Sequence, residues 1–244
     1  DDCKNETKSK KKKNKNMSYQ IAIDGPVSPW KGKVARLVAS KLGFLYVDTG
    51  AMYRATALLS KEHKVDLHNE TAVAELVSQY SMMLRNPTEE EKDGRQITVL
   101  LDDKDVSWAI RTEENSTGAS IVAQHALVRK ELVKKQQEIA AKTSVVMEGR
   151  DITFRVLPDA QIKIYLDASI ETRAKRRHQE LLARGVDTSF EQVYKDTSDR
   201  DKRDMERVVD PLHIEQTAWV LDSTSLEIEE VVELIVSKAK ELGA

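Results

Sequence analysis

The sequence predicts an α/β fold in which a central parallel sheet of five strands lies between two layers of helices. Short apolar runs alternate with longer helical stretches along the chain, and each apolar run finishes with an acidic residue. Strands that alternate with helices form parallel βαβ units, which join into a doubly wound sheet. A content of 40% apolar and 33% charged residues is that of an ordinary globular protein.

The predicted elements follow one another in a regular order. The strands are IAID (21–24), FLYVD (44–48), SVVME (144–148), IKIYLD (162–167) and AWVLD (218–222). The helices cover 33–42, 51–62, 113–142, 170–185 and 226–241. In the last helix apolar residues recur with helical spacing, and Thr224 with Glu227 is expected to form a capping box. Ligands bind at the carboxyl ends of the strands in such folds, where the acidic strand ends should gather: Asp24, Asp48, Glu148, Asp167 and Asp222.

Two segments interrupt this alternation. Residues 68–112 contain a predicted helix over 69–85, a polar stretch and two short strands around the DDK turn of ITVLLDDKDVSW (97–108), which indicates an inserted α+β subdomain. Residues 171–207 are helical and dense in arginine. We therefore expect one domain over 19–244, with a core made of 19–67, 113–170 and 208–244.

Residues 1–18 are expected to form a disordered, Lys-rich tail. The first sixteen residues hold seven Lys, three acidic residues and nothing to bury. The rest of the chain is acidic, which argues against nucleic acid as the main partner. No apolar run approaches the roughly 18 residues of a membrane span, so no membrane partner is expected. The only cysteine, Cys3, lies in the tail, and a body without thiols fits a reducing, cytoplasmic location.

The stretch GPVSPWKGK (25–33) stands where a phosphate-binding loop would lie, between a predicted strand and a helix. Such a loop uses glycines so that backbone N–H groups can point at an anion, and its lysine reaches the terminal phosphates. Gly25, Lys31 and Gly32 agree with the pattern. Trp30 replaces its second glycine, Lys33 stands where a hydroxyl is expected, and Pro29 removes one N–H. On this stretch alone, an ordinary βα turn is the alternative interpretation.

Other segments resemble one family in the same order and spacing. They are VDTGAMYRATALL (47–59), ITVLLDDKDVSWAIRTEE (97–114), EGRD (148–151), IKIYLDAS (162–169), RDKRDMER (200–207) and VLDST (220–224). This set is similar to the bacterial cytidylate kinases, which belong to the nucleoside monophosphate kinases. The resemblance covers nearly the whole body and implies a P-loop three-layer αβα fold with a monophosphate-binding insert (68–112) and a helical lid (171–207). It also implies transfer of the γ-phosphoryl group of ATP to CMP or dCMP by a monomer, with Mg²⁺ accompanying ATP.

The resemblance implies a role for each matching residue. ATP would bind to the loop Gly25, Pro26, Val27, Ser28, Pro29, Trp30, Lys31, Gly32 and Lys33. CMP would bind to Thr49, Tyr53, Arg54, Ser120, Arg129, Arg150, Asp151, Arg200, Asp204 and Arg207, of which Ser120 and Arg129 read the base. The catalytic set would be Lys31, Arg150, Asp151 and the lid arginines Arg173, Arg176 and Arg177. No residue is assigned as a direct metal ligand, although Asp24 could hold Mg²⁺ through water.

Physical chemistry agrees with these roles but leaves alternatives. Phosphoryl transfer needs positioning and neutralisation of charge, for which the planar fork of arginine is well suited. The arginine-rich helix could instead be a solvated face, and RDKRDMER could be a ladder of salt bridges within one helix.

The chain departs from the family in the loop and again after EGRDI, where Thr153, Phe154 and Arg155 replace the usual residues. The first hypothesis is a working kinase. The second is a CMP-binding protein with little or no catalysis, because Pro29, Trp30 and Lys33 impair the ATP loop. A third is a kinase whose loop was altered by design or sequence error.

Overall fold

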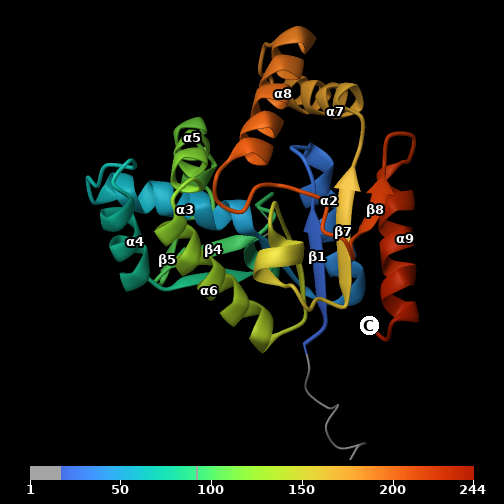
Figure 1. Ribbon diagram of the computed structural model, residues 1–244, viewed down its shortest axis with the longest axis horizontal. Coiled ribbons are helices and arrows are strands. Elements are labelled where there is room, and N and C mark those ends of the chain that lie inside the picture. Colours follow the sequence, from blue (N-terminus) through green and yellow to red (C-terminus); the bar gives the residue numbers. More distant parts are fainter. Residues whose placement is uncertain (1–17, 92) are drawn as a thin grey trace, which may run out of the picture.

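A parallel sheet of five strands forms the centre of the computed structural model, which describes residues 18–91 and 93–244 (Figure 1). The strand order is β2-β6-β1-β7-β8. The strands are β1 (Gln20–Asp24), β2 (Leu45–Asp48), β6 (Val145–Gly149), β7 (Ile162–Asp167) and β8 (Trp219–Asp222). The five predicted strands and the αβα arrangement are therefore confirmed. The Lys-rich tail, apart from residue 18, lies outside the described residues.

The central strands are buried on both faces, which explains why they consist of continuous apolar runs. Ile21, Ala22 and Ile23 of β1 have no exposed surface. The flanking helices are α2 (Pro29–Leu42), α3 (Thr49–Glu62), α5 (Glu113–Val122), α6 (Ala126–Lys142) and α9 (Ile228–Glu241). Helix α2 packs on β1, β2, β6 and α9, so the helix that follows the 25–33 loop is anchored to the centre of the sheet.

The insert differs from its prediction at one point. The predicted helix over 69–85 is α4 (Glu70–Gln79) followed by strand β3 (Met82–Arg85), which pairs antiparallel with β4 (Thr98–Leu101). Strand β5 (Lys104–Asp105) completes the small sheet, so the two strands around the DDK turn are confirmed. Met82 and Leu84 are buried while Met83 is exposed, an alternation with the period of a strand.

Two helix boundaries also differ. The predicted helix over 113–142 is broken between α5 and α6, where the His125 ring pairs with the carbonyl of Leu67. Helix α9 begins at Ile228 with a capping box formed by Glu227 and Glu230, so the predicted box at Thr224 is wrong. The Thr224 hydroxyl is instead bonded to Asp222 and Ser169 at the end of the sheet.

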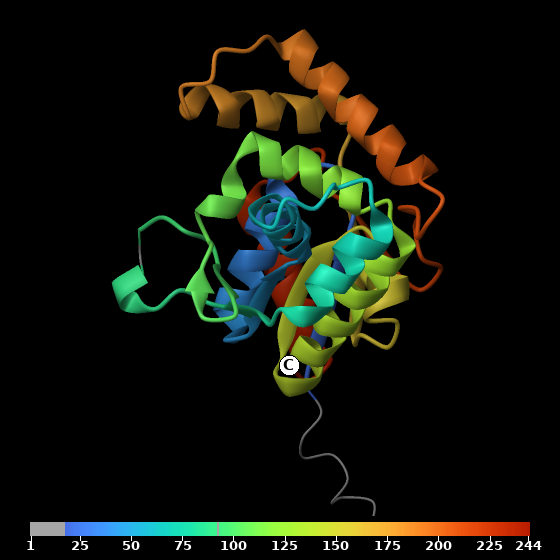
Figure 2. The same ribbon diagram turned by 90° about the vertical axis from the view of Figure 1, so that its left-hand side faces the viewer.

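Helices α7 (Ile170–Ala183) and α8 (Phe190–Glu206) project beyond the carboxyl end of the sheet as a pair (Figures 1 and 2). They correspond to the arginine-rich segment predicted to be helical. Within the described residues, no helix is both long and apolar enough to cross a membrane.

Candidate active site

The 25–33 loop leaves β1 through a residue that must be glycine. Gly25 has φ +153°, and a Cβ atom there would lie 2.2 Å from the backbone oxygen of Leu166 on the neighbouring strand β7. Ser28 caps α2 by accepting a hydrogen bond from the N–H of Trp30, and the proline at position 29 suits the first helical turn. Helix α2 therefore begins at Pro29, four residues before its prediction, and its amino end points toward the candidate site.

Four of the nine loop residues offer no free backbone N–H to an anion. Residues 26 and 29 are prolines without an N–H, and the N–H of Trp30 is taken by Ser28. The N–H of Val27 donates to the Asp201 carboxylate over 2.9 Å. Since Asp201 also pairs with Arg173 at 2.5 Å, and Arg173 donates to the carbonyl of Val27, the loop is tied to both lid helices.

Lys31, the predicted phosphate-binding lysine, lies in the first turn of α2. Its side chain is almost fully buried, and its Nζ lies 3.0 Å from the Glu148 carboxylate at the end of β6. Burial lowers the pKa of Lys31, and the positive charge of Arg150 lowers it further against the opposing effect of Glu148. A bound phosphate would favour the charged form of Lys31, because it adds negative charge beside a desolvated ammonium group.

Trp30 contacts one of the predicted lid arginines. The Arg176 guanidinium carbon lies 3.2 Å from the centroid of the indole ring, and the same guanidinium donates to the hydroxyl and the carbonyl of Ser223. Arg177, the third lid arginine, pairs with Glu180 on its own helix. Lys33 on α2 is exposed. Arg173 and Arg176 thus already hold protein partners beside the donor loop.

A second group of side chains gathers around the start of α3. Asp48 caps this helix and pairs with Arg54 at 2.7 Å, while Arg111 of the insert approaches the same carboxylate to 3.9 Å. Burial alone would raise the pKa of Asp48, but the two arginines hold it below its ordinary value. The buried Nε of Arg54 has no hydrogen-bond partner among the described residues, which leaves one N–H for an anion.

The predicted sugar and base residues form a connected network. Arg129 is almost fully buried, pairs with Asp151 and Asp210, and lies 5.8 Å from the ring centroid of Tyr53. The Thr49 hydroxyl donates to the carbonyl of Glu148. These contacts join β6, α3 and α6 at one end of the sheet.

The last part of α8 adds positive charge to this end. Arg150 pairs with Asp204 at 2.7 Å, and Arg207 donates to the carbonyl of Asp210. Partial desolvation among neighbouring side chains and the charge of Arg150 lower the pKa of Arg200 to about 10, so the arginines are crowded. Of the predicted CMP residues, Ser120 and Arg200 have no side-chain hydrogen bond, ion pair or ring contact among the described residues; the carbonyl of Ser120 accepts a hydrogen bond from Gln124.

Asp24, the candidate for water-mediated contact with Mg²⁺, is already engaged. Its carboxylate has no exposed surface and accepts hydrogen bonds from the N–H of Ile152 and from the N–H and hydroxyl of Thr153. Burial raises the pKa of Asp24 to about 6. No group of three or more metal-ligating residues lies together in the described part of the chain. The residues present therefore do not form a direct site for Mg²⁺.

The second departure, residues 153–155, has structural contacts. Thr153 holds Asp24, Phe154 packs on the His213 ring at 4.0 Å between centroids, and Arg155 lies 3.8 Å from Asp210. They belong to the π-helical turn η3 (Ile152–Val156), which follows β6 and lies beside β1. The second departure thus lies beside the end of β1, from which the 25–33 loop leaves.

Sequence reasoning missed several partners of the predicted residues. Glu148, Asp201 and Asp210 hold Lys31, Arg173 and Arg129, and Arg111 joins Asp48 from the insert. The acidic ends of the strands were a signal for Glu148 and Asp48. No local signal identified Asp201, Asp210 or Arg111, because their partners lie far away in the sequence.

Comparisons with known proteins agree with this arrangement. The family model described as cytidylate kinase matches residues 21–241. A cytidylate kinase from Bacillus cereus is 48% identical over 217 residues, which is 89% of this chain and 94% of that protein. A cytidylate kinase from Bacillus thuringiensis is 47% identical over 216 residues, or 88% and 93% of the two chains. With its central sheet, its phosphate-loop position and its arginine network, the chain belongs to the cytidylate kinase family.

Proposed function

We propose that the protein transfers the γ-phosphoryl group of ATP to CMP or dCMP, giving CDP or dCDP. The observation that carries this proposal is the convergence of Lys31, Arg54, Arg150 and Arg200 at the carboxyl end of one sheet. The positive charges of Arg150 and Arg200 each lower the pKa of Lys31, which places the three groups within mutual electrostatic range. Three of these cations are balanced by Glu148, Asp48 and Asp204, and a phosphate would add negative charge beside Arg200, which has no ion pair in the described part of the chain.

Each side of the site has a separate task in this proposal. Arg54, Arg150, Arg200 and Arg207 hold the CMP phosphate, while Thr49, Tyr53, Ser120, Arg129, Asp151 and Asp204 hold the base and the sugar. Lys31 and the loop hold the ATP phosphates. An oxygen of the CMP phosphate then attacks the γ-phosphorus, and the bond from that phosphorus to the bridging oxygen breaks, with its electron pair leaving on ADP. Positive groups that are fixed beforehand stabilise the charge spread over the transferred group.

The lid completes the site. Arg173 anchors α7 to the loop through Asp201, so closure of α7 and α8 would move Arg176 and Arg177 relative to the donor phosphates. Closure excludes water, which would otherwise accept the phosphoryl group. Mg²⁺ enters with ATP in this proposal, bound by its phosphates and by water.

A specific observation supports the second candidate function, a CMP-binding protein with weak or no catalysis. The 25–33 loop has no N–H at Pro26 and Pro29, and two further N–H groups are occupied by Ser28 and Asp201. Loss of one such donor to a transition state costs about 2.7–4 kcal/mol, or two to three powers of ten in rate. A slow kinase is the more direct consequence of this loop than an inactive one.

Titration calorimetry with ATP–Mg²⁺ and, separately, with CMP tests both candidates. The kinase proposal expects both ligands to bind and CMP to be converted to CDP at high enzyme concentration. Binding of CMP without ATP supports the second candidate, and failure of CMP to bind contradicts both. The proposal further holds that the chain acts as a monomer, since the residues assigned to both ligands lie within one chain. It also holds that the protein acts in the cytoplasm.

A further inference from the structure

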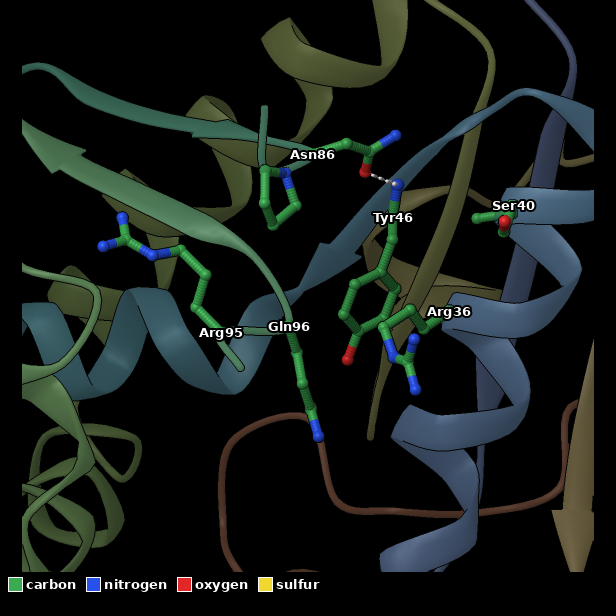
Figure 3. A pocket seen from close by; sticks show the side chains of 8 residues that line it. Arg36, Ser40, Tyr46, Asn86, Arg95 and Gln96 are labelled. Carbon is green, nitrogen blue, oxygen red and sulfur yellow. Dashed lines mark hydrogen bonds between the residues drawn. The ribbon is translucent and has the colours of Figure 1, made fainter. Parts of the chain in front are cut away.

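A cavity lies between the central sheet and the insert, and none of the residues around it is assigned to ATP or CMP (Figure 3). Its volume is about 280 Å³, enough for a molecule with a single ring. Helix α2 and β2 form one wall, and the segments after β3 and before β4 form the other. The residues around it are Arg36, Ala39, Ser40, Tyr46, Asn86, Pro87, Arg95 and Gln96.

The cavity is positively charged through Arg36. None of the described residues forms an ion pair or a hydrogen bond with this guanidinium, and its Nε is buried without a partner. The second arginine, Arg95, is already neutralised by Asp93 and Asp105. None of the lining residues is acidic. Arg36 is therefore a cation beside a cavity, and a buried N–H without a partner favours a ligand that can accept from it.

The apolar lining residue with the most accessible surface is Pro87, which is partly exposed. The Tyr46 side chain is almost completely buried and lies beside Arg36, and the ends of Arg36, Tyr46 and Gln96 face the same part of the cavity (Figure 3). Asn86 accepts a hydrogen bond from the N–H of Tyr46 and donates to the carbonyl of Phe44. These two bonds fasten the insert to β2, so the cavity has a fixed wall on each side.

We propose that this cavity binds a small organic anion, with its oxyanion head at Arg36 and an apolar ring against Pro87. The site is separate from the ATP and CMP sites, yet it touches the donor loop. Arg36 lies on α2, whose first turn carries Lys31, and a Cβ atom at Gly32 would lie 3.2 Å from the Tyr46 hydroxyl. A ligand in the cavity thus contacts the helix and the tyrosine that border the loop.

Nuclear magnetic resonance on the ¹⁵N-labelled full chain tests the proposal, with CMP present in excess to fill the substrate site. The probes are phenyl phosphate and benzoate, which share an aromatic ring and differ in the oxyanion. Saturable shifts are expected for the Arg36 Nε–H and the backbone amides of Ser40, Gln96 and Gly32. The tighter of the two probes identifies the head group as a phosphate ester or a carboxylate.

Two variants separate this site from general attraction of anions. Arg36→Gln should weaken probe binding by at least about tenfold, as expected for loss of a charged hydrogen bond. Lys41→Gln removes the same charge from an exposed part of the same helix and should leave binding unchanged. Arg36→Lys keeps the charge and should retain part of the affinity, which guards against misfolding of the first variant. Equal binding by Arg36→Gln and the unaltered protein, or the absence of saturable shifts with both probes, would overturn the proposal.

Discussion

Restoring the donor loop is the most direct test of how this chain differs from its relatives. The change is the double substitution Trp30→Gly with Lys33→Thr, which supplies the missing glycine and hydroxyl. In the structure the Trp30 ring lies against Arg176, and its N–H is held by Ser28. Removal of the ring frees the Arg176 guanidinium face, and glycine allows the loop N–H groups to turn toward an anion.

Two opposite effects are expected from this change. One preorganised donor to the transferred phosphate typically raises the rate by about two to three powers of ten, so we expect kcat to increase by about tenfold to a thousandfold. Stability should fall, because the cation–π contact with Arg176 is worth about 0.5–2 kcal/mol. A glycine inside a helix costs about 1 kcal/mol more. The free energy of unfolding should therefore decrease by about 1.5–3 kcal/mol.

A coupled assay of ADP formation with CMP as acceptor measures the first effect, and urea unfolding measures the second. The single variants Trp30→Gly and Lys33→Thr show which position limits the rate. Lys41→Thr, on the exposed face of the same helix, is the matched control for loss of a lysine. If kcat of the double variant stays at the level of the unaltered protein while ATP binds to both, the loop does not limit turnover and the reasoning is wrong.

Three further predictions concern stability. The pKa of Asp24 is raised to about 6, so the native state holds a proton that the unfolded state releases near pH 4. The free energy of unfolding should then decrease as the pH rises from about 4 to about 6. Asp24→Asn should remove most of this pH dependence in urea titrations. Arg129→Met leaves Asp151 buried without its cation and should cost about 3–5 kcal/mol, visible as a lower Tm; an unchanged Tm contradicts the buried pair. Gly25→Ala would bring a Cβ atom within 2.2 Å of the Leu166 oxygen, so a soluble variant with native stability would refute the assigned loop geometry.

Local sequence patterns determined most of the secondary structure of this protein. The five strands are apolar runs bounded by turns, and burial on both faces requires that composition. The segment 82–85 shows where such patterns fail. Its residues MMLR continue an apolar helical pattern, but pairing with β4 makes them a strand. The polar stretch of the insert separates β3 from β4 in the sequence. Pairing between the two strands overrides the weak helical propensity of four residues.

Helix ends were decided by contacts that a linear pattern does not contain. Thr224 has the spacing of a capping residue, yet its hydroxyl bonds to Asp222 and Ser169, and Ser169 lies 55 residues away. The break before α6 depends in the same way on the contact of His125 with Leu67. Capping needs a side chain that no distant group has already engaged.

The sequence by itself determined which family the chain belongs to, and it predicted most residues of the candidate site. Only the tertiary structure decided how they are paired: Val27 with Asp201 across 174 residues, and Asp24 with Thr153 across 129. The physical reason is that a parallel sheet brings the carboxyl ends of distant strands to one edge. At that edge charged side chains must find partners or lose solvation. Which acid neutralises which arginine therefore follows from the fold and cannot be read from the spacing of residues along the chain.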